Sequence, residues 1–411
     1  MSANDNTSPQ ELITALSGVR VLDLGRVLAA PFAAQVLGDL GAEVIKIERP
    51  DGGDDTRPWK PPETGGNSAY FAAINRNKRS VTLDFGSDEG REVFYELVRK
   101  SDVVIQNFRP GVSERLGIDY ESLKAIRPEL IYCSISGFGQ QGPLSTRAAY
   151  DYIVQAFSGV MSLTGEVDGD PVRCAGAISD YGSGIWAVIS ILFALMERDR
   201  MGRGQHIDLS MLDCTLPYIS HLIGNYLAAG IDPPRLGNGH TSIVPMDVYQ
   251  TQDRPLMVMC GNDGMFRRMM SALGAPELGE DPRYALNVDR AENLPELQEW
   301  IREQFKTDNQ EGWLKRLSEA DIPVAPVRSV AETMNSDEIR DRQMILELED
   351  PNGKPVRLLG SPLKFSESSV AKNVKLPPRL AEHTREVLAE LAGISEERLQ
   401  QLIERGVTSV E

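Results

Sequence analysis

An acidic side chain ahead of a long apolar segment is the first candidate for chemistry in this sequence. Asp180 lies in ISDYGSG, residues 178–184, directly before the apolar run Ile185–Met196. We expect a helix to begin at Gly182 or Ser183, so that its positive end and unpaired N–H groups keep the nearby carboxylate ionised. An ionised carboxylate can act as a nucleophile. From the residues alone, however, a plain N-cap role is the favoured explanation of an aspartate here, because such acids are more often structural than catalytic.

A glycine-rich segment offers a second kind of catalytic group, the backbone N–H. Residues 237–240, Gly-Asn-Gly-His, could approach a reacting centre closely and donate hydrogen bonds to an oxyanion. A plain interdomain turn is the alternative interpretation. The four cysteines and four histidines are scattered without the spacing of a zinc site or a disulfide framework. We therefore expect no metal centre.

Composition and charge limit the possible partners. The chain has 411 residues, 41% of them hydrophobic and 25% charged, which is typical of a globular protein large enough for two domains. A net charge of −17 argues against binding to nucleic acid or to an anionic membrane. The polar N-terminus lacks the features of a targeting peptide, and the run Ile185–Met196 is too short to span a bilayer. We expect a cytoplasmic protein with a disordered tail at residues 1–16.

Alternating strands and helices must position the candidate groups. Apolar runs and turn signals indicate strands at 19–24, 43–48, 80–85, 102–108 and 130–136, with helices from Pro31 to Gly41, at 89–100 and at 120–126. Strands separated by helices favour a parallel sheet. The first half therefore predicts a doubly wound α/β domain.

The second half is more helical and is divided by proline-bearing segments. Pro233-Pro234 and the stretch 321–327, DIPVAPV, mark two crossings between domains. The predicted domains are 17–225 with 328–411, and 226–327. The expected helices are one from Gly182 or Ser183 to about Arg198, those at 211–229, 263–273, 294–306 and 309–319, and two that close the chain, the last capped by Ser395. A strand is expected at 205–210. Hairpins are expected at 244–260 and at 345–359, the second with its turn at Asn352-Gly353.

Nicotinamide-dependent dehydrogenases are one class of enzyme that contains such a domain. Glu48 ends the second strand, where a ribose-binding acid would be expected. However, the turn after the first strand, Leu24–Pro31, lacks the GxGxxG pattern that lets a pyrophosphate approach the backbone. Arg49 follows Glu48 directly and suits a phosphate or an adenine ring. The dehydrogenase hypothesis is therefore disfavoured.

Several segments in order along the chain carry a resemblance to the class III CoA-transferases. They are LDLGRVLAAPFAAQVLGDLGAEVIKIERP (22–50), NRNKRSVTLDF (75–85), QNFRPGVSERLG (106–117), SISGFGQQGP (134–143), SDYGSG (179–184), GRGQHIDLSMLD (202–213) and GNGHTSIVP (237–245). From about residue 17 to its end the chain resembles the formyl-CoA, carnitine and succinate–hydroxymethylglutarate CoA-transferases, the last most closely. The resemblance implies a homodimer of interlocked rings, each subunit with a large Rossmann-like domain and a smaller α+β domain.

The resemblance implies that Asp180 is a covalent nucleophile. Its carboxylate would attack an acyl-CoA to give an acyl-aspartyl anhydride, and the released CoA thiolate would then form an aspartyl-CoA thioester. The acceptor acid would reverse these steps. No permanently bound cofactor is implied, because CoA and acyl-CoA are substrates. The nearest relatives imply succinyl-CoA as donor and a dicarboxylic acid as acceptor.

The matching positions also imply binding residues. The CoA-binding positions are Val27, Leu28, Ala29, Arg49, Leu83, Asn107, Phe108 and Arg115. Trp59, Tyr70 and His240 match substrate-lining positions, and Gly237 and Gly239 match the family's mobile glycine loop. That loop is shorter here than in the formyl enzymes, which argues against formyl transfer. Further cations are possible partners of the CoA phosphates (Arg76, Lys78 and Arg79) or of a distal carboxylate on the acid (Arg57, Arg147 and Arg173).

Two other functions remain as alternatives. The α-methylacyl-CoA racemases resemble the same family, but they have a histidine directly before an aspartate where this chain has Tyr150-Asp151. Asp247 does fall near the position of the racemase acid, and racemases need both groups for proton transfer. A noncatalytic CoA-binding protein is the third hypothesis, and the retention of Asp180 and the glycine loop argues against it.

Overall fold

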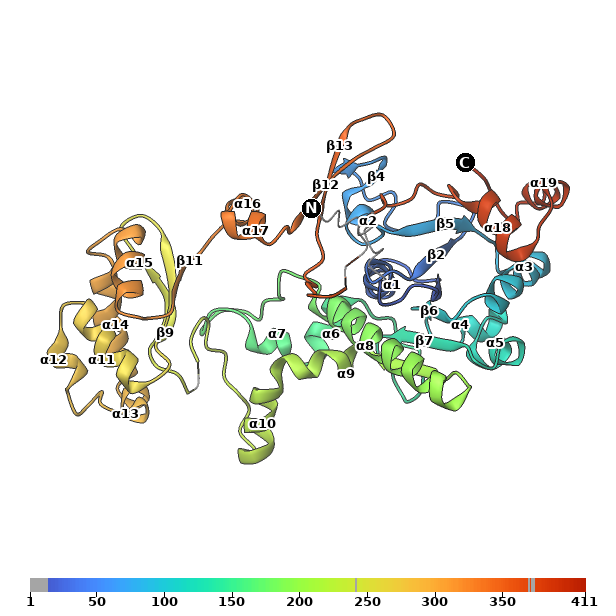
Figure 1. Cartoon of the computed structure of the whole chain (residues 1–411). Helices are drawn as coiled ribbons and strands as arrows, with labels where there is room; N and C mark the ends of the chain where they lie inside the picture. The colour runs from blue at the N-terminus through green and yellow to red at the C-terminus, as the bar shows by residue number, and fades with distance from the viewer. Residues whose placement is uncertain (1–13, 241, 369, 371–373) are drawn as a thin grey trace, which may run out of the picture. The chain divides into compact units, whose positions relative to one another are not determined.

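The computed structural model describes residues 14–240, 242–368, 370 and 374–411, which form two compact units (Figure 1). The large unit contains the described residues up to Ser158, with Cys174–His221 and Arg340–Glu411. The small unit contains Gly159–Arg173 and Leu222–Ile339. These units differ from the predicted domains chiefly at 159–173 and 328–339. Residues 1–13 of the predicted tail lie outside the described residues.

A six-stranded parallel sheet forms the centre of the large unit (Figure 1). Its order is β5-β2-β1-β6-β7-β8, and every neighbouring pair is parallel. The strands are β1 (Arg20–Asp23), β2 (Glu43–Glu48), β5 (Lys78–Thr82), β6 (Val103–Gln106), β7 (Ile131–Ser136) and β8 (His206–Ser210). The order runs outward from β1 and β6, so the doubly wound prediction is confirmed.

Alternating side chains on these strands build two hydrophobic cores, one on each face of the sheet. Val21 of β1 faces the core formed with α1 (Ala29–Asp39) and α8 (Ile178–Met201). Leu22 faces the other core. That second core is covered by α3 (Asp88–Arg99), α5 (Tyr120–Ile126), α18 (Thr384–Ala392) and α19 (Glu396–Glu404). The C-terminal segment thus packs on a sheet made by the first half of the chain.

Two helices begin earlier than the sequence predicts. Helix α1 begins at Ala29 rather than at Pro31, because the chain turns sharply at Val27 (φ 65°) and Leu28 becomes the N-cap residue. Helix α8 begins at Ile178 rather than at Gly182 or Ser183. Asp180 therefore lies inside the first turn of α8 and not ahead of the helix.

Helix α8 is also longer than the apolar run suggests. It has 24 residues, and by length and composition alone it could cross a membrane. The prediction from the sequence considered only the shorter run Ile185–Met196, which is too short to do so. Half of its most apolar window is buried, and the helix packs on α1. These are the properties of a core helix.

The remaining elements of the large unit are short. They are α2 (Ala69–Ala73), α4 (Val112–Leu116), α6 (Asp151–Phe157), α9 (Met211–Thr215), the 3-10 helix η1 (Leu216–Ile219) and the hairpins β3 (Glu63–Thr64) with β4 (Asn67–Ser68) and β12 (Ile345–Glu349) with β13 (Pro355–Leu359). The predicted turn at Asn352-Gly353 and the Ser395 cap are confirmed. Helices α10 (Ser220–Ala229) and α17 (Asp337–Asp341) carry the chain between the units.

The small unit is built on a three-stranded antiparallel sheet, β11-β10-β9. Its strands are β9 (Met246–Gln250), β10 (Pro255–Met259) and β11 (Val324–Pro326), and its helices are α7 (Val160–Leu163), α11 (Asp263–Ala272), α12 (Pro276–Gly279), α13 (Asn287–Glu292), α14 (Leu294–Phe305), α15 (Gln310–Glu319) and α16 (Val330–Met334). The predicted hairpin and its three helices are confirmed. The segment predicted as a crossing contributes β11, which pairs with β10.

Candidate active site

A cavity of about 340 Å³ lies where the carboxyl ends of the parallel strands meet. Its walls come from the turn after β1, the loop after β6, the end of β7 and the start of α8. Five of the predicted site residues line it: Val27, Ala29, Asn107, Phe108 and Asp180. This edge of a doubly wound sheet is where ligands bind in such folds.

A second carboxylate holds the beginning of α8. Asp151 is the first residue of α6, and its Oδ2 accepts hydrogen bonds from the backbone N–H groups of Ser179 (2.7 Å) and Asp180 (3.1 Å). Gln155 donates from Nε2 to the other oxygen of Asp151 at 2.5 Å. Asp151 thus takes the capping role that the sequence offered to Asp180, and the Asp180 side chain is left to face the cavity.

The environment of Asp180 disfavours its charge. Burial, and then the neighbouring negative charge of Asp151, raise the pKa of Asp180 to about 7. The helix end therefore does not lower the pKa of Asp180 as predicted, and two of the N–H groups at that end donate to Asp151 instead. Near pH 7 Asp180 is poised between its neutral acid form and a poorly solvated, reactive carboxylate.

Two aromatic side chains accompany Asp180. The rings of Trp59 and Tyr70 pack edge to face with centroids 4.9 Å apart, and both are partly exposed. Burial and the Asp180 carboxylate raise the pKa of Tyr70, so the phenol remains neutral and can donate a hydrogen bond. Tyr70 thus lies close enough to Asp180 to sense its charge.

Glycines bring α8 close to its neighbours beside Asp180. A Cβ on Gly184 would lie 2.7 Å from the Phe32 ring and 2.9 Å from the Ala29 carbonyl oxygen. A Cβ on Gly182 would lie 2.7 Å from the ring of Tyr218. The GSG pattern after Asp180 therefore serves close packing around the carboxylate.

A second cavity, of about 240 Å³, lies beside the first. Arg26 and Phe108 line both cavities, and the Arg26 guanidinium stands 5.3 Å from the centre of the Phe108 ring. Arg49 and Leu83, both predicted to bind CoA, line the second cavity. The two cavities together suit an elongated ligand whose ends differ in chemistry.

Two predicted CoA-binding residues do not line either cavity. Leu28 is 2% exposed and packs in the interior as the N-cap of α1. Arg115 is exposed on α4, and its neighbour Leu116 lines the second cavity instead. The family resemblance thus identified these segments, but it did not determine which side chains face the space.

The structure also separates the candidate cations. The buried Arg76 pairs with Asp39, and Arg79 pairs with Glu43, Glu386 and Glu390. Lys78 is fully buried against Asp23 at 2.8 Å. None of these three residues lines either of the two cavities, and acidic groups of the protein pair with each of them.

Of the three arginines considered for a distal carboxylate, only Arg147 lines the Asp180 cavity. Arg57 forms a bidentate pair with Glu48, both bonds 2.7 Å long, and Arg173 belongs to the small unit. The Arg147 guanidinium lies 6.0 Å and 5.8 Å from the ring centres of Phe138 and Phe157. Among the described residues, no carboxylate forms an ion pair with Arg147.

The glycine loop belongs to the small unit. Gly237 has a positive φ of 59°, and the Gly239 N–H donates to the Leu236 carbonyl at 2.8 Å. His240 accepts from the Ser242 N–H at 2.9 Å through Nδ1. In the described part of the chain no group of three or more His, Cys, Asp and Glu side chains could hold a metal ion.

Sequence reasoning missed two residues of the site. It compared Asp151 only with the racemases, although this residue shapes the environment of Asp180. It left out Arg26, which lies between both cavities. No local signal marks either residue, because each acquires its role from a segment distant in sequence.

Comparison of the sequence and the structure with those of known proteins identifies the family. A family model described as "CoA-transferase family III" matches residues 16–384. The succinate–glutarate CoA-transferase of Agrobacterium fabrum is 42% identical over 92% of this chain and 96% of that protein. The acetyl-CoA:oxalate CoA-transferase of Acetobacter aceti is 43% identical over 88% of this chain and 91% of that protein. A crystal structure of a CAIB/BAIF family protein from Brucella suis, 42% identical, covers 92% of this chain and 99% of its own with a TM-score of 0.83. The chain belongs to CoA-transferase family III and is a CoA-transferase, which moves CoA between an acyl-CoA and a carboxylic acid.

Proposed function

We propose that this enzyme transfers CoA from succinyl-CoA to a free dicarboxylic acid through covalent intermediates on Asp180. The observation that carries the proposal is the cavity itself, which is lined both by a carboxylate with a raised pKa, Asp180, and by a cation that has no acidic partner among the described residues, Arg147. Raised pKa values of this kind are typical of catalytic groups. The neighbouring cavity supplies room and cations for the rest of the CoA molecule.

The chemistry is a sequence of acyl substitutions. An Asp180 carboxylate oxygen attacks the thioester carbonyl of the donor, the C–S bond breaks, and CoA leaves as a thiolate. The thiolate attacks the Asp180 carbonyl of the resulting anhydride, and the donor acid leaves as a carboxylate. The acceptor carboxylate then attacks the aspartyl-CoA thioester, and the CoA thiolate attacks the acceptor carbonyl of the second anhydride. Asp180 is regenerated, and no proton or electron is gained or lost.

A dicarboxylic substrate is supported by charge. Arg147 supplies a guanidinium to the lining of the cavity that also contains Asp180, and two carboxylate oxygens can pair with it. The relatives above are named for succinate, glutarate and oxalate, all of which are dicarboxylic acids. We propose Trp59 and Tyr70 as neighbours of the acid chain.

We assign oxyanion stabilisation to the N–H groups of Gly237 and Gly239, and we place His240 beside the substrate. In the structure the Gly239 N–H is bonded within its own turn to Leu236. Donation to an oxyanion therefore requires that this turn rearranges when substrate binds. Two glycines make such a change inexpensive in steric terms.

We also propose a homodimer. One face of α8 presents large apolar side chains to the outside of the large unit, and such faces mark association surfaces. The exposed residues are Tyr181, Ile185, Trp186, Ile189, Phe193 and Met196. Light scattering of the purified protein tests the oligomeric state. A cytoplasmic location remains a prediction.

Mass spectrometry of CoA species tests the reaction. The protein is incubated with succinyl-CoA and a mixture of mono- and dicarboxylic acids, and a new dicarboxylyl-CoA is expected. Intact-protein mass spectrometry of the quenched reaction is expected to show a CoA adduct that Asp180→Asn lacks. Transfer at the wild-type rate by Asp180→Asn would disprove the proposed mechanism.

The same samples distinguish the two alternatives. A racemase would incorporate deuterium from heavy water into a branched acyl-CoA without CoA transfer. The structure gives no support for that role, because Asp247 accepts hydrogen bonds from Gln298 at 2.6 Å and from Arg302 at 2.8 Å. A noncatalytic protein would bind CoA, but it would produce no new acyl-CoA and incorporate no deuterium.

A further inference from the structure

The turn between β1 and α1 is the strained part of the site. Gly25 and Arg26 line the second cavity, and Arg26 and Val27 line the first. Val27 has a φ of 65°, in the left-handed region that β-branched residues rarely adopt. Such a conformation is strained for a residue other than glycine. Contacts elsewhere in the molecule must therefore hold the turn in this shape.

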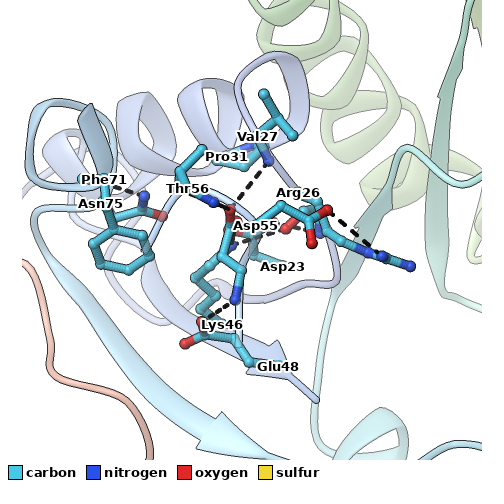
Figure 2. Close-up of polar contacts among 12 residues, drawn as sticks. Asp23, Arg26, Val27, Pro31, Lys46, Glu48, Asp55, Thr56, Phe71 and Asn75 are labelled. Carbon is cyan, nitrogen blue, oxygen red and sulfur yellow. Dashed lines mark hydrogen bonds and ion pairs between the residues drawn. The ribbon is translucent and has the colours of Figure 1, made fainter. Parts of the chain in front are cut away.

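Charged side chains from the neighbouring strands and from the loop after β2 bind the peptide groups of the turn (Figure 2). The Gly25 N–H donates to Asp23 Oδ1 at 2.9 Å, and Lys46 Nζ donates to the Gly25 carbonyl at 2.8 Å. The Val27 N–H points to Asp54 Oδ1 at 3.4 Å. Three side chains from β1, β2 and the loop after β2 thus converge on one turn.

An amide side chain binds the middle of the turn from the neighbouring strand end. Asn107 Oδ1 accepts from the Arg26 N–H at 2.8 Å, and Asn107 Nδ2 donates to the Arg26 carbonyl at 2.8 Å. Both polar groups of Asn107 are therefore engaged with the backbone of Arg26. Because of these two bonds, Asn107 ties the loop after β6 to the turn after β1.

The charges beneath the turn are fully buried. Lys46 lies 2.9 Å from Asp54 and 3.8 Å from Asp23, and Lys78 lies 2.8 Å from Asp23, with no exposed side-chain surface on any of the four. Burial alone would lower the pKa of Lys46, but the surrounding carboxylates raise it, so Lys46 stays charged. Burial lowers the pKa of Lys78 to about 8, and Asp23 offsets part of that effect.

A buried ionic group of this kind is weak evidence for stability as such, since well-packed apolar residues often serve stability as well. Its geometry is informative because its hydrogen bonds end on the backbone of the turn. Lys46 binds the Gly25 carbonyl, and Lys78 binds the Pro31 carbonyl at 2.7 Å at the start of α1. The group therefore fixes the turn at two points, on either side of Val27.

We propose that Lys46, Asp54 and Asn107 are positioning residues that together hold the Gly25–Val27 turn in the conformation that binds CoA. Lys46 and Asp54 belong to the lining of the second cavity but have no exposed side-chain surface, and their polar side-chain atoms bind the backbone of the turn. Asn107 reaches the cavity wall but uses its amide on Arg26. The choice of CoA as the ligand rests on the proposed function.

A double-mutant cycle on CoA binding tests the proposal. The dissociation constant of coenzyme A is measured by calorimetry for the wild type, Val27→Gly, Asn107→Ala and the double variant. Each single change is expected to weaken binding about tenfold, and the double variant should be within about threefold of the weaker single variant, because both changes release the same turn. If the double variant weakens CoA binding by the product of the two single effects, to within threefold, the residues act independently and the proposal is overturned.

Asp54→Asn provides a second arm that does not depend on the first. Asp54 has no exposed side-chain surface, so Asp54→Asn is expected to weaken CoA binding by weakening the ion pair with Lys46 and the contact with the Val27 N–H. Asp102→Asn is the matched control, since Asp102 pairs with Arg127 and Arg198 at the opposite ends of the strands. The proposal predicts a CoA dissociation constant raised at least fivefold for Asp54→Asn and unchanged for Asp102→Asn. Equal values for the two variants would contradict it.

Stability measurements separate positioning from folding. Val27→Gly relieves the left-handed strain, so its thermal midpoint should equal or exceed that of the wild type while its CoA binding weakens. If Asn107→Ala does not fold, Asn107→Asp takes its place, because it keeps the acceptor toward the Arg26 N–H and loses the donor. Binding needs no turnover, so a protein that binds CoA without transferring it would refute the proposed function and leave this cycle interpretable.

Discussion

The charge of Asp151 should control the pH at which this enzyme becomes active. Asp151→Asn keeps an acceptor for the Ser179 and Asp180 N–H groups but removes the negative charge that raises the pKa of Asp180. At an effective dielectric constant of 20, two unit charges repel by roughly 1.7 kcal/mol even about 10 Å apart, or just over one pKa unit. Solvent at the cavity mouth screens part of this repulsion, so we expect a decrease of about one unit.

The assay is the pH profile of kcat/KM for CoA transfer, which reports the ionisation of the free enzyme. With a pKa of about 7, roughly one tenth of Asp180 is ionised at pH 6. A decrease to about 6 ionises half of it, so activity at pH 6 relative to pH 8.5 should rise about fivefold. Asp119→Asn is the matched control, because Asp119 caps α5 in the same way and lines neither cavity. An unchanged or raised apparent pKa in Asp151→Asn would refute the electrostatic argument.

Three further changes test the site. Asp180→Asn should abolish transfer yet stabilise the fold above pH 7. Because the pKa of Asp180 is raised in the folded state, the wild type loses up to roughly 4 kcal/mol of stability as the pH rises from about 4 to 7, and the variant does not. Thermal unfolding at pH 8 should therefore show a higher midpoint for the variant than for the wild type. Arg147→Gln should raise the KM for glutarate about 10- to 100-fold and leave that for butyrate unchanged, because a charge-assisted bond contributes about 1.5–3 kcal/mol; equal effects on both acids would exclude a distal carboxylate contact. Gly184→Ala should cost about 1–3 kcal/mol in urea unfolding, since its Cβ would meet Phe32 and the Ala29 carbonyl at under 3 Å, and an unchanged unfolding free energy would contradict the close packing.

The main elements of the fold were predictable because their signals are local. Most strands of the parallel sheet contain a short apolar run, and the order of the strands in the chain leaves few topologies. Short elements were missed, among them α6 and β11, which have seven and three residues. Elements of that length have no stable periodicity of their own and form only where other segments pack against them. The starts of α1 and α8 were misplaced for the same reason, because Asp151 and the turn at Val27 determine them from outside the helices.

The sequence predicted that Asp180 belongs to the candidate site, and it lines the cavity, but the sequence did not predict the electrostatic environment of Asp180. The position of Asp180 follows from its motif, yet its partner Asp151 lies 29 residues away in another helix. Asn107 is 81 residues from the Arg26 backbone that it binds. These contacts arise because the ends of parallel strands from separate βαβ units meet at one edge. A sequence pattern indicates the residues on each strand end, whereas the partners across the edge depend on loop conformations that no local pattern specifies.

The local charges explain how a protein with a net charge of −17 can bind a polyanion. Lys46 and Lys78 cannot attract CoA, because Asp23 and Asp54 neutralise them below the surface. The attraction must come from exposed arginines such as Arg26 and Arg49, which both pair with Asp55, at 3.7 Å and 2.7 Å. A CoA phosphate would therefore compete with Asp55 for cations that are already in place, so binding exchanges one anion for another. Such an exchange gains less Coulomb energy than pairing free arginines, and recognition must then rely on the shape of the turn that the buried charges maintain.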